Sequence, residues 1–142
     1  MMESDAPSPE TPAPKDTRKQ LGTLGEAETA AFLENHGYRV IDANVRPLGG
    51  RRRGEIDIVA WHGDYLVFIE VKTRRSGSVA RPTPAEAVNW RKRRQLVHLA
   101  NSYIARYRLD DVPCRFDVVE VLRIAESLSF NLIENAFDGG DV

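Results

Sequence analysis

The chain has 142 residues, 42% of them hydrophobic, which suits one compact domain. No apolar run reaches the roughly eighteen residues of a membrane-spanning helix, and the acidic, proline-rich start does not resemble a secretory signal. A single cysteine, Cys114, excludes an internal disulfide and a cysteine-based metal site, so we expect a cytoplasmic protein with no membrane partner.

The net charge of −1 argues weakly against a general nucleic-acid binder, but the charges are unevenly distributed. Acidic residues dominate both ends, whereas basic residues gather in the middle. The basic clusters are Arg51–Arg53, Arg74–Arg75 and Arg91–Arg94. A basic middle can present a positive face to phosphate, although solvated loops and one solvated helix face explain each cluster equally well.

The first elements along the chain are a tail and a helix. Residues 1–16 contain four of the eight prolines and little that is bulky and apolar, which predicts a disordered tail ahead of a single domain over residues 17–142. A helix is predicted from Thr17 to His36. It should end at Gly37, where glycine permits a left-handed backbone.

Extended segments and a second helix follow. The predicted strands are Tyr38–Val45, Glu55–Trp61, Tyr65–Thr73, Arg115–Leu122 and Leu128–Glu134. The second and third are joined by a short glycine-containing turn typical of a hairpin. Ahead of the fourth, Thr83 and Glu86 form a capping box that predicts the start of a helix reaching Tyr107. The order α-β-β-β-α-β predicts an α/β fold, in which helices flank a mixed sheet.

Charged residues interrupt the two central strands. Glu55 and Asp57 share one face of the second strand, and Glu70 and Lys72 share one face of the apolar third strand. A strand this apolar is usually buried on both sides, where unpaired charges cost on the order of several kcal/mol. Glu70 and Lys72 could instead reach solvent at a strand end, or form a structural ion pair.

A second carboxylate on the adjoining hairpin strand favours a third interpretation. Asp57 and Glu70 could converge on a hard cation such as Mg²⁺, which prefers oxygen ligands. Lys72 beside that ion could orient or deprotonate a bound water and balance phosphate charge. Glu55 could support the site from outside or simply be an exposed residue at the start of its strand. Metal, carboxylates and lysine are what in-line attack on a phosphodiester needs.

At this point the sequence resembles a known family, over about residues 20–137. Asp57, twelve intervening residues and Glu70-Val71-Lys72 resemble the Asp…Glu-x-Lys core of the restriction-endonuclease-like superfamily. A longer ordered set resembles the YraN family, small bacterial proteins that are similar to archaeal Holliday-junction resolvases and are predicted to be nucleases. The set comprises Gly25-Glu26, Ala43-Asn44-Val45-Arg46, Gly54-Glu55-Ile56-Asp57, Val67-Phe68-Ile69-Glu70-Val71-Lys72-Thr73-Arg74, Glu86-Ala87-Val88 and Arg115-Phe116-Asp117-Val118-Val119.

The resemblance implies a restriction-endonuclease-like fold with a divalent-metal site that takes Mg²⁺ or Mn²⁺. It makes Asp57 and Glu70 metal ligands, adds the backbone carbonyl of Val71, and makes Lys72 the catalytic lysine. Glu26 matches the first-helix glutamate that joins the acidic cluster in the resolvases. Helical periodicity places Glu28 rather than Glu26 in the apolar stripe, so both remain candidates for this fourth carboxylate.

Three basic residues are candidates for nucleic-acid contact. Lys92 falls within the apolar stripe of the second predicted helix, so it must extend out to solvent or point toward something negative, such as a phosphate. Arg74 follows the third-strand motif, and Arg53 ends a basic loop that is longer than the family pattern. Trp61 and Trp90 could stack on bases, although tryptophan in a small domain more often packs in the core or on a hairpin.

Together these features predict a metal-dependent endonuclease that acts on DNA, including branched or processed DNA. One alternative is a nucleic-acid-binding module that keeps the fold but cleaves little, within a larger DNA-processing assembly. Another is a partner-binding protein whose carboxylates hold structural ion pairs. A homodimer would suit a junction cutter, which must cut two strands, but no sequence feature indicates one. The sequence also does not separate DNA from RNA.

Overall fold

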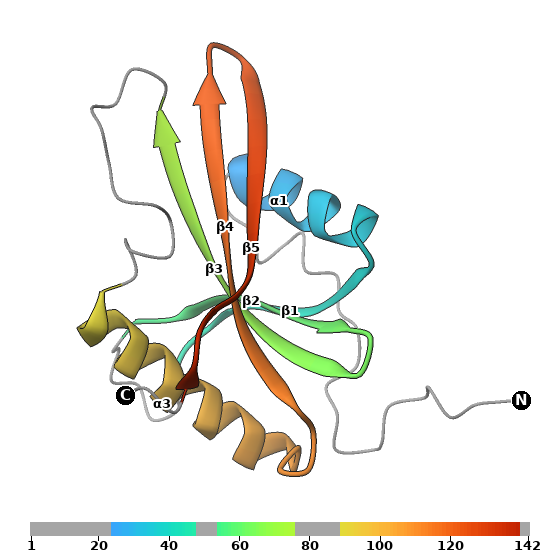
Figure 1. The fold of residues 1–142 in the computed structure, drawn as a ribbon, viewed down its shortest axis with the longest axis vertical. Helices are drawn as coiled ribbons and strands as arrows, with labels where there is room; N and C mark the ends of the chain where they lie inside the picture. Colours follow the sequence, from blue (N-terminus) through green and yellow to red (C-terminus); the bar gives the residue numbers. More distant parts are fainter. Residues whose placement is uncertain (1–23, 48–53, 76–88, 140–142) are drawn as a thin grey trace, which may run out of the picture.

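The computed structural model describes residues 24–47, 54–75 and 89–139, and Figure 1 shows how they are arranged. Its elements are α1 (Leu24–Asn35), β1 (Tyr38–Val45), β2 (Ile56–His62), β3 (Tyr65–Arg75), α3 (Trp90–Tyr107), β4 (Cys114–Ile124) and β5 (Ser127–Phe137). The predicted mixed α/β class is confirmed. The order α-β-β-β-α-β-β is consistent with a restriction-endonuclease-like core.

The strands form one mixed sheet in the order β1-β2-β3-β4-β5. Three neighbouring pairs are antiparallel, while β3 and β4 are parallel and are connected through α3. The β2–β3 hairpin turns at Gly63, whose positive φ of 61° suits a tight two-residue turn. In Figure 1, β1 and β2 run across the direction of β3, β4 and β5, because the sheet is strongly twisted.

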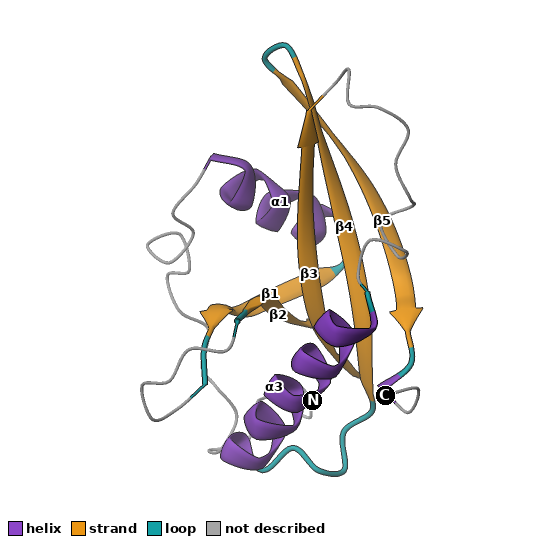
Figure 2. Ribbon diagram, turned by 90° about the vertical axis from the view of Figure 1, so that its left-hand side faces the viewer, coloured by secondary structure: helices purple, strands orange, loops and turns teal. Residues whose placement is uncertain are grey.

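Within residues 24–47, 54–75 and 89–139, each face of the sheet carries one helix. Leu33 of α1 packs with Ile58 and Ile69 on one face, and Leu96 of α3 packs with Phe68 on the other. Figure 2 shows α1 beside the upper part of the long strands and α3 beside their lower part. Within the described residues, neither helix is both long and apolar enough to cross a membrane.

The end of α1 agrees with its sequence prediction, whereas the start of α3 does not. Gly37 adopts a positive φ of 89° directly after α1, as predicted. The helix predicted from Thr83 instead begins at Trp90, because Asn89 has an extended backbone and its side chain accepts a hydrogen bond from Lys92 N at 2.9 Å. An extended N-cap interrupts any helix entering from the preceding residues. The prediction of one continuous helix from Thr83 to Tyr107 is therefore wrong.

Several predictions lie outside the described residues. They are the tail over residues 1–16, the first part of the helix predicted from Thr17, the capping box at Thr83–Glu86, and Arg53.

A buried polar network joins four of the strands. Asp117 on β4 is 1% exposed and accepts hydrogen bonds from Tyr38 Oη at 2.7 Å and from the backbone N–H of Asn135 at 2.8 Å. Arg115 donates to both Asp117 oxygens at 2.9 Å, and its Nη2 lies 2.7 Å from His62 Nδ1. The Arg-x-Asp pair of the family resemblance therefore ties strands together, and His62, which had no predicted role, joins them.

Candidate metal centre

The β2–β3 hairpin brings two of the predicted carboxylates together. Ile58 and Ile69 are a cross-strand pair, so continuing the register places Asp57 opposite Glu70. Asp57 Oδ2 accepts a hydrogen bond from the backbone N–H of Val71 at 2.8 Å. The Asp57 carboxylate thus accepts a backbone hydrogen bond where the pairing of β2 with β3 ends. The bond to Val71 N–H holds the carboxylate against β3.

Glu70 is a buried carboxylate with an unused oxygen. The residue is 5% exposed, and its Oε2 lies 3.6 Å from Lys72 Nζ and 3.8 Å from Lys92 Nζ. Both distances exceed the roughly 2.7–2.9 Å of a charge-assisted hydrogen bond. Oε1 is buried and has no hydrogen-bond partner in the described part of the chain. Because an unpaired buried acceptor costs on the order of 1–3 kcal/mol, Glu70 can accept a further positive group.

Asp57 is destabilised in its charged form. Burial, and next the negative charge of Glu70, raise the pKa of Asp57 from 3.8 to about 7, against the opposing hydrogen bond from Val71 N–H. Glu55 adds a smaller repulsion, and Lys92 a smaller attraction. The attraction from Lys92 is thus smaller than the effect of Glu70, and a cation shared by the two carboxylates would offset the repulsion that contributes to this raised pKa.

The first turns of α3 close the site from above the sheet. Lys92 approaches Glu70 from this helix, as its place in the apolar stripe suggested. One turn later, Gln95 lies against Gly54, where a Cβ would collide with the Gln95 side chain. Gly54 also has a positive φ of 85°, so glycine suits this position, three residues before Asp57, for two reasons. Sequence reasoning missed Gln95, since its border position on the stripe carries no chemical signal of its own.

The two carboxylates suit Mg²⁺ or Mn²⁺, which would complete its coordination with water. They do not suit a metal that needs a full set of side-chain ligands. Across residues 24–47, 54–75 and 89–139, no three His, Cys, Asp or Glu side chains gather where they could hold a metal ion. Mg²⁺ does not require such a group, because it commonly binds through one or two carboxylates and keeps several waters. Asp57 and Glu70 meet that requirement, and Oε1 of Glu70, which has no partner in the part of the chain that the structure describes, is an acceptor available to the ion.

The remaining predicted residues lie in varied surroundings. Glu26 lies in the first turn of α1, where a negative charge favours the helix dipole, and does not complete a three-carboxylate group with Asp57 and Glu70 within the described chain. Glu28, the alternative, has a buried Oε1 without a hydrogen-bond partner among the described residues. Arg74 pairs with Glu120 at 2.8 Å. The metal-ligand role of the Val71 carbonyl stays a prediction.

Glu55 is a partly exposed residue next to the site, and its charge contributes to the raised pKa of Asp57. It lies just before β2, and its Oε1 accepts a hydrogen bond from Arg46 Nε at 3.0 Å, in a pair whose side chains are 29% and 53% exposed. An exposed pair of this kind contributes about 0–1 kcal/mol.

Comparison with known proteins places the chain in a family. The family model described as "Uncharacterised protein family UPF0102" matches residues 25–121. UPF0102 proteins from Symbiobacterium thermophilum and Alkaliphilus metalliredigens are 48% and 46% identical over 120 and 119 residues. Each alignment covers 84% of this chain, and they cover 97% and 98% of the two relatives, respectively. The chain therefore belongs to the UPF0102 family, which is the YraN family that its motifs resemble.

Proposed function

We propose that this protein is a metal-dependent endonuclease that hydrolyses phosphodiester bonds in DNA. One observation carries the proposal: Glu70, a buried carboxylate with an oxygen that has no hydrogen-bond partner among the described residues, faces a second carboxylate, Asp57, whose pKa is raised to about 7. Such a pair is costly to folding and is relieved by a divalent cation. Perturbed acids of this kind concentrate at functional sites.

Each residue of the site has a role in this chemistry. Asp57 and Glu70 would hold Mg²⁺ or Mn²⁺, which would supply Lewis-acid polarisation of the phosphate. Lys72 lies 3.6 Å from Glu70 and is 34% exposed in its side chain, so its ammonium group can reach both the site and solvent. We assign to the Lys72 ammonium group the orientation of the attacking water and the balancing of phosphate charge. Lys92, 3.8 Å from the same oxygen, would neutralise the phosphate.

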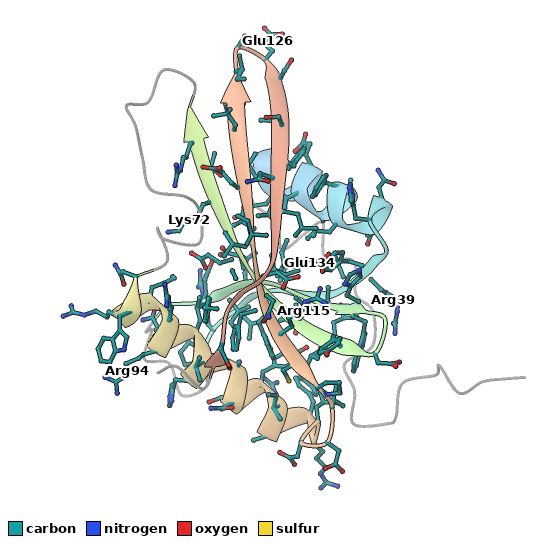
Figure 3. All side chains as sticks on the ribbon, in the orientation of Figure 1. Arg39, Lys72, Arg94, Arg115, Glu126 and Glu134 are labelled. Carbon is teal, nitrogen blue, oxygen red and sulfur yellow. The ribbon has the colours of Figure 1, made fainter. Side chains whose placement is uncertain are left out.

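The charge around the site supports a nucleic-acid substrate. The first turn of α3 holds four consecutive basic residues, Arg91 to Arg94, and no acidic one. Figure 3 labels Lys72 and Arg94, which both lie toward the left of the view, on β3 and on α3. Positive side chains beside a metal-binding carboxylate pair suit a phosphate backbone, which dominates the affinity of most nucleic-acid complexes.

A cleavage assay tests the proposal. The substrates are supercoiled plasmid, single strands, flaps and four-way junctions, each with Mg²⁺, Mn²⁺ or EDTA. The variants Asp57→Asn and Lys72→Met remove a ligand and the ammonium group with little change in size. Arg39→Ala is the matched control, because Arg39 is an exposed basic residue on β1, at the opposite side of the view in Figure 3.

The proposal predicts cutting that requires the metal, is lost in both site variants and persists in Arg39→Ala. Intact DNA on every substrate, combined with equal DNA binding by wild type and both variants, would replace it with a binding module that does not cleave.

A further inference from the structure

The N-terminus of α3 carries an exposed tryptophan. Trp90, the first residue of the helix, is 57% exposed, and the guanidinium of Arg94 lies 4.7 Å from its ring centroid. The other tryptophan, Trp61, packs against the hydrophobic core, as expected of tryptophan in a small domain. Trp90 therefore has a large flat surface in solvent that core packing does not use.

The charge at this end of α3 is unfavourable for the helix alone. Lys92 and three arginines occupy the first turns, where the helix dipole is positive, and the first turn itself contains no acidic residue. Arg93 lies 5.7 Å from the ring of Phe137, so it also packs against the fold. Trp90, Arg91 and Arg94 are exposed. An anionic ligand would reverse this repulsion, and the exposed aromatic ring indicates that the ligand also has a flat apolar part.

The exposed ring of Trp90 lies some distance from the carboxylate pair, and this distance determines which nucleotide of a bound DNA strand could contact the ring. Lys92 extends from the same helix turn to within 3.8 Å of Glu70, while Trp90 lies about 200° around the helix from it. A helix with its side chains is about 10–12 Å across. A single strand that spans about this distance places the nucleotide at Trp90 a few positions along from the phosphate beside Glu70.

We propose that Trp90 and Arg94 form a stacking site for an unpaired base, which identifies the substrate class as DNA with a single-stranded segment beside the cleaved phosphate. The inference rests on the proposed function, because it places the scissile phosphate at Asp57 and Glu70. Stacking on aromatic rings, backed by arginine, is how proteins bind single strands without reading their sequence. A base inside a continuous duplex is already stacked on its neighbours and cannot use this surface.

A binding measurement tests the stacking site without depending on cleavage. Asp57→Asn protein in EDTA is titrated into labelled oligothymidylate and into a blunt duplex, with and without Trp90→Ala. Base stacking on an aromatic ring predicts that Trp90→Ala weakens binding of the single strand by about 5- to 150-fold, with a much smaller change for the duplex. Trp90→Phe should restore most of the loss, because phenylalanine keeps a ring.

Two further variants sharpen the result. Trp61→Phe leaves Trp90 as the sole tryptophan, so its emission should be quenched by the single strand and changed little by the duplex. Tyr65→Ala is the matched control, since Tyr65 is an aromatic residue 43% exposed at the β2–β3 turn, and it should leave binding unchanged.

The outcomes separate this inference from the proposed function. Equal loss of single-strand and duplex binding in Trp90→Ala, or no loss at all, overturns the stacking site even if the wild-type protein cleaves DNA. Conversely, single-strand binding that depends on Trp90 upholds it even if no substrate is ever cut.

Discussion

The raised pKa of Asp57 predicts an unusual dependence of stability on pH. Between about pH 4 and pH 7 the folded protein holds a proton on Asp57 that the unfolded chain releases. The free energy of unfolding in EDTA therefore falls as pH rises through this interval, and the loss is complete above it. A change from 3.8 to about 7 corresponds to at most about 4 kcal/mol, and water reaching the partly exposed carboxylate reduces this to roughly 2–3 kcal/mol.

Asp57→Asn isolates this effect, because asparagine removes the charge and keeps an oxygen to accept the Val71 N–H. In urea denaturation with EDTA, the variant should be about 2–3 kcal/mol more stable than wild type at pH 8.5 and nearly equal to it at pH 4.5. Asp64→Asn is the control, because Asp64 is an exposed carboxylate in the hairpin turn. Equal stabilities of wild type and Asp57→Asn at pH 8.5, or a less stable variant, would refute the raised pKa of Asp57, to which burial and the charge of Glu70 both contribute.

Three substitutions elsewhere test the packing that supports the site. Asp117→Ala removes the centre of the buried network and should cost about 3–5 kcal/mol in urea denaturation, whereas a loss below about 1 kcal/mol would mean that the network contributes little. Gly54→Ala places a side chain at φ 85° and should cost about 1–2 kcal/mol by the same method; an unchanged denaturation midpoint would contradict that strain. Asn89→Ala should cost about 1 kcal/mol and speed amide exchange in the first turn of α3, while Asn101→Ala, at an exposed position within the helix, should not destabilise it.

Local patterns predicted the elements that hold the site. Strand β1 has the bounds Tyr38–Val45 that its sequence indicated, since Gly37 ends the preceding helix and the segment is rich in strand-forming residues. The short turn at Gly63 fixes which residues of β2 and β3 pair in the hairpin. This pairing, together with the alternation of side chains along each strand, was enough to predict that Asp57 lies opposite Glu70. Likewise, the position of Lys92 within an otherwise apolar stripe of its helix indicated that its side chain points toward a negative group, and it lies near Glu70.

Other features were not recognised from such patterns. Asn89 caps α3 with an extended backbone and the helix begins at Trp90, whereas the capping box at Thr83 lies outside the described residues. The pairing of Arg74 with Glu120 depends on the parallel register of β3 and β4, which brings together residues far apart in the chain. The exposure of Trp90 was equally inaccessible, because a tryptophan has the same local signature in a core and on a surface.

Binding of Mn²⁺ shows whether Asp57 and Glu70 hold a metal ion, and it does not depend on choosing the right DNA. Electron paramagnetic resonance of free Mn²⁺, titrated with protein at pH 8.5, measures binding to wild type, Asp57→Asn, Glu70→Gln and the control Asp64→Asn. We expect a single Mn²⁺ site that is lost in both site variants and retained in the control. Wild-type protein that leaves Mn²⁺ free, or binding that survives in both site variants, would contradict a metal centre at Asp57 and Glu70.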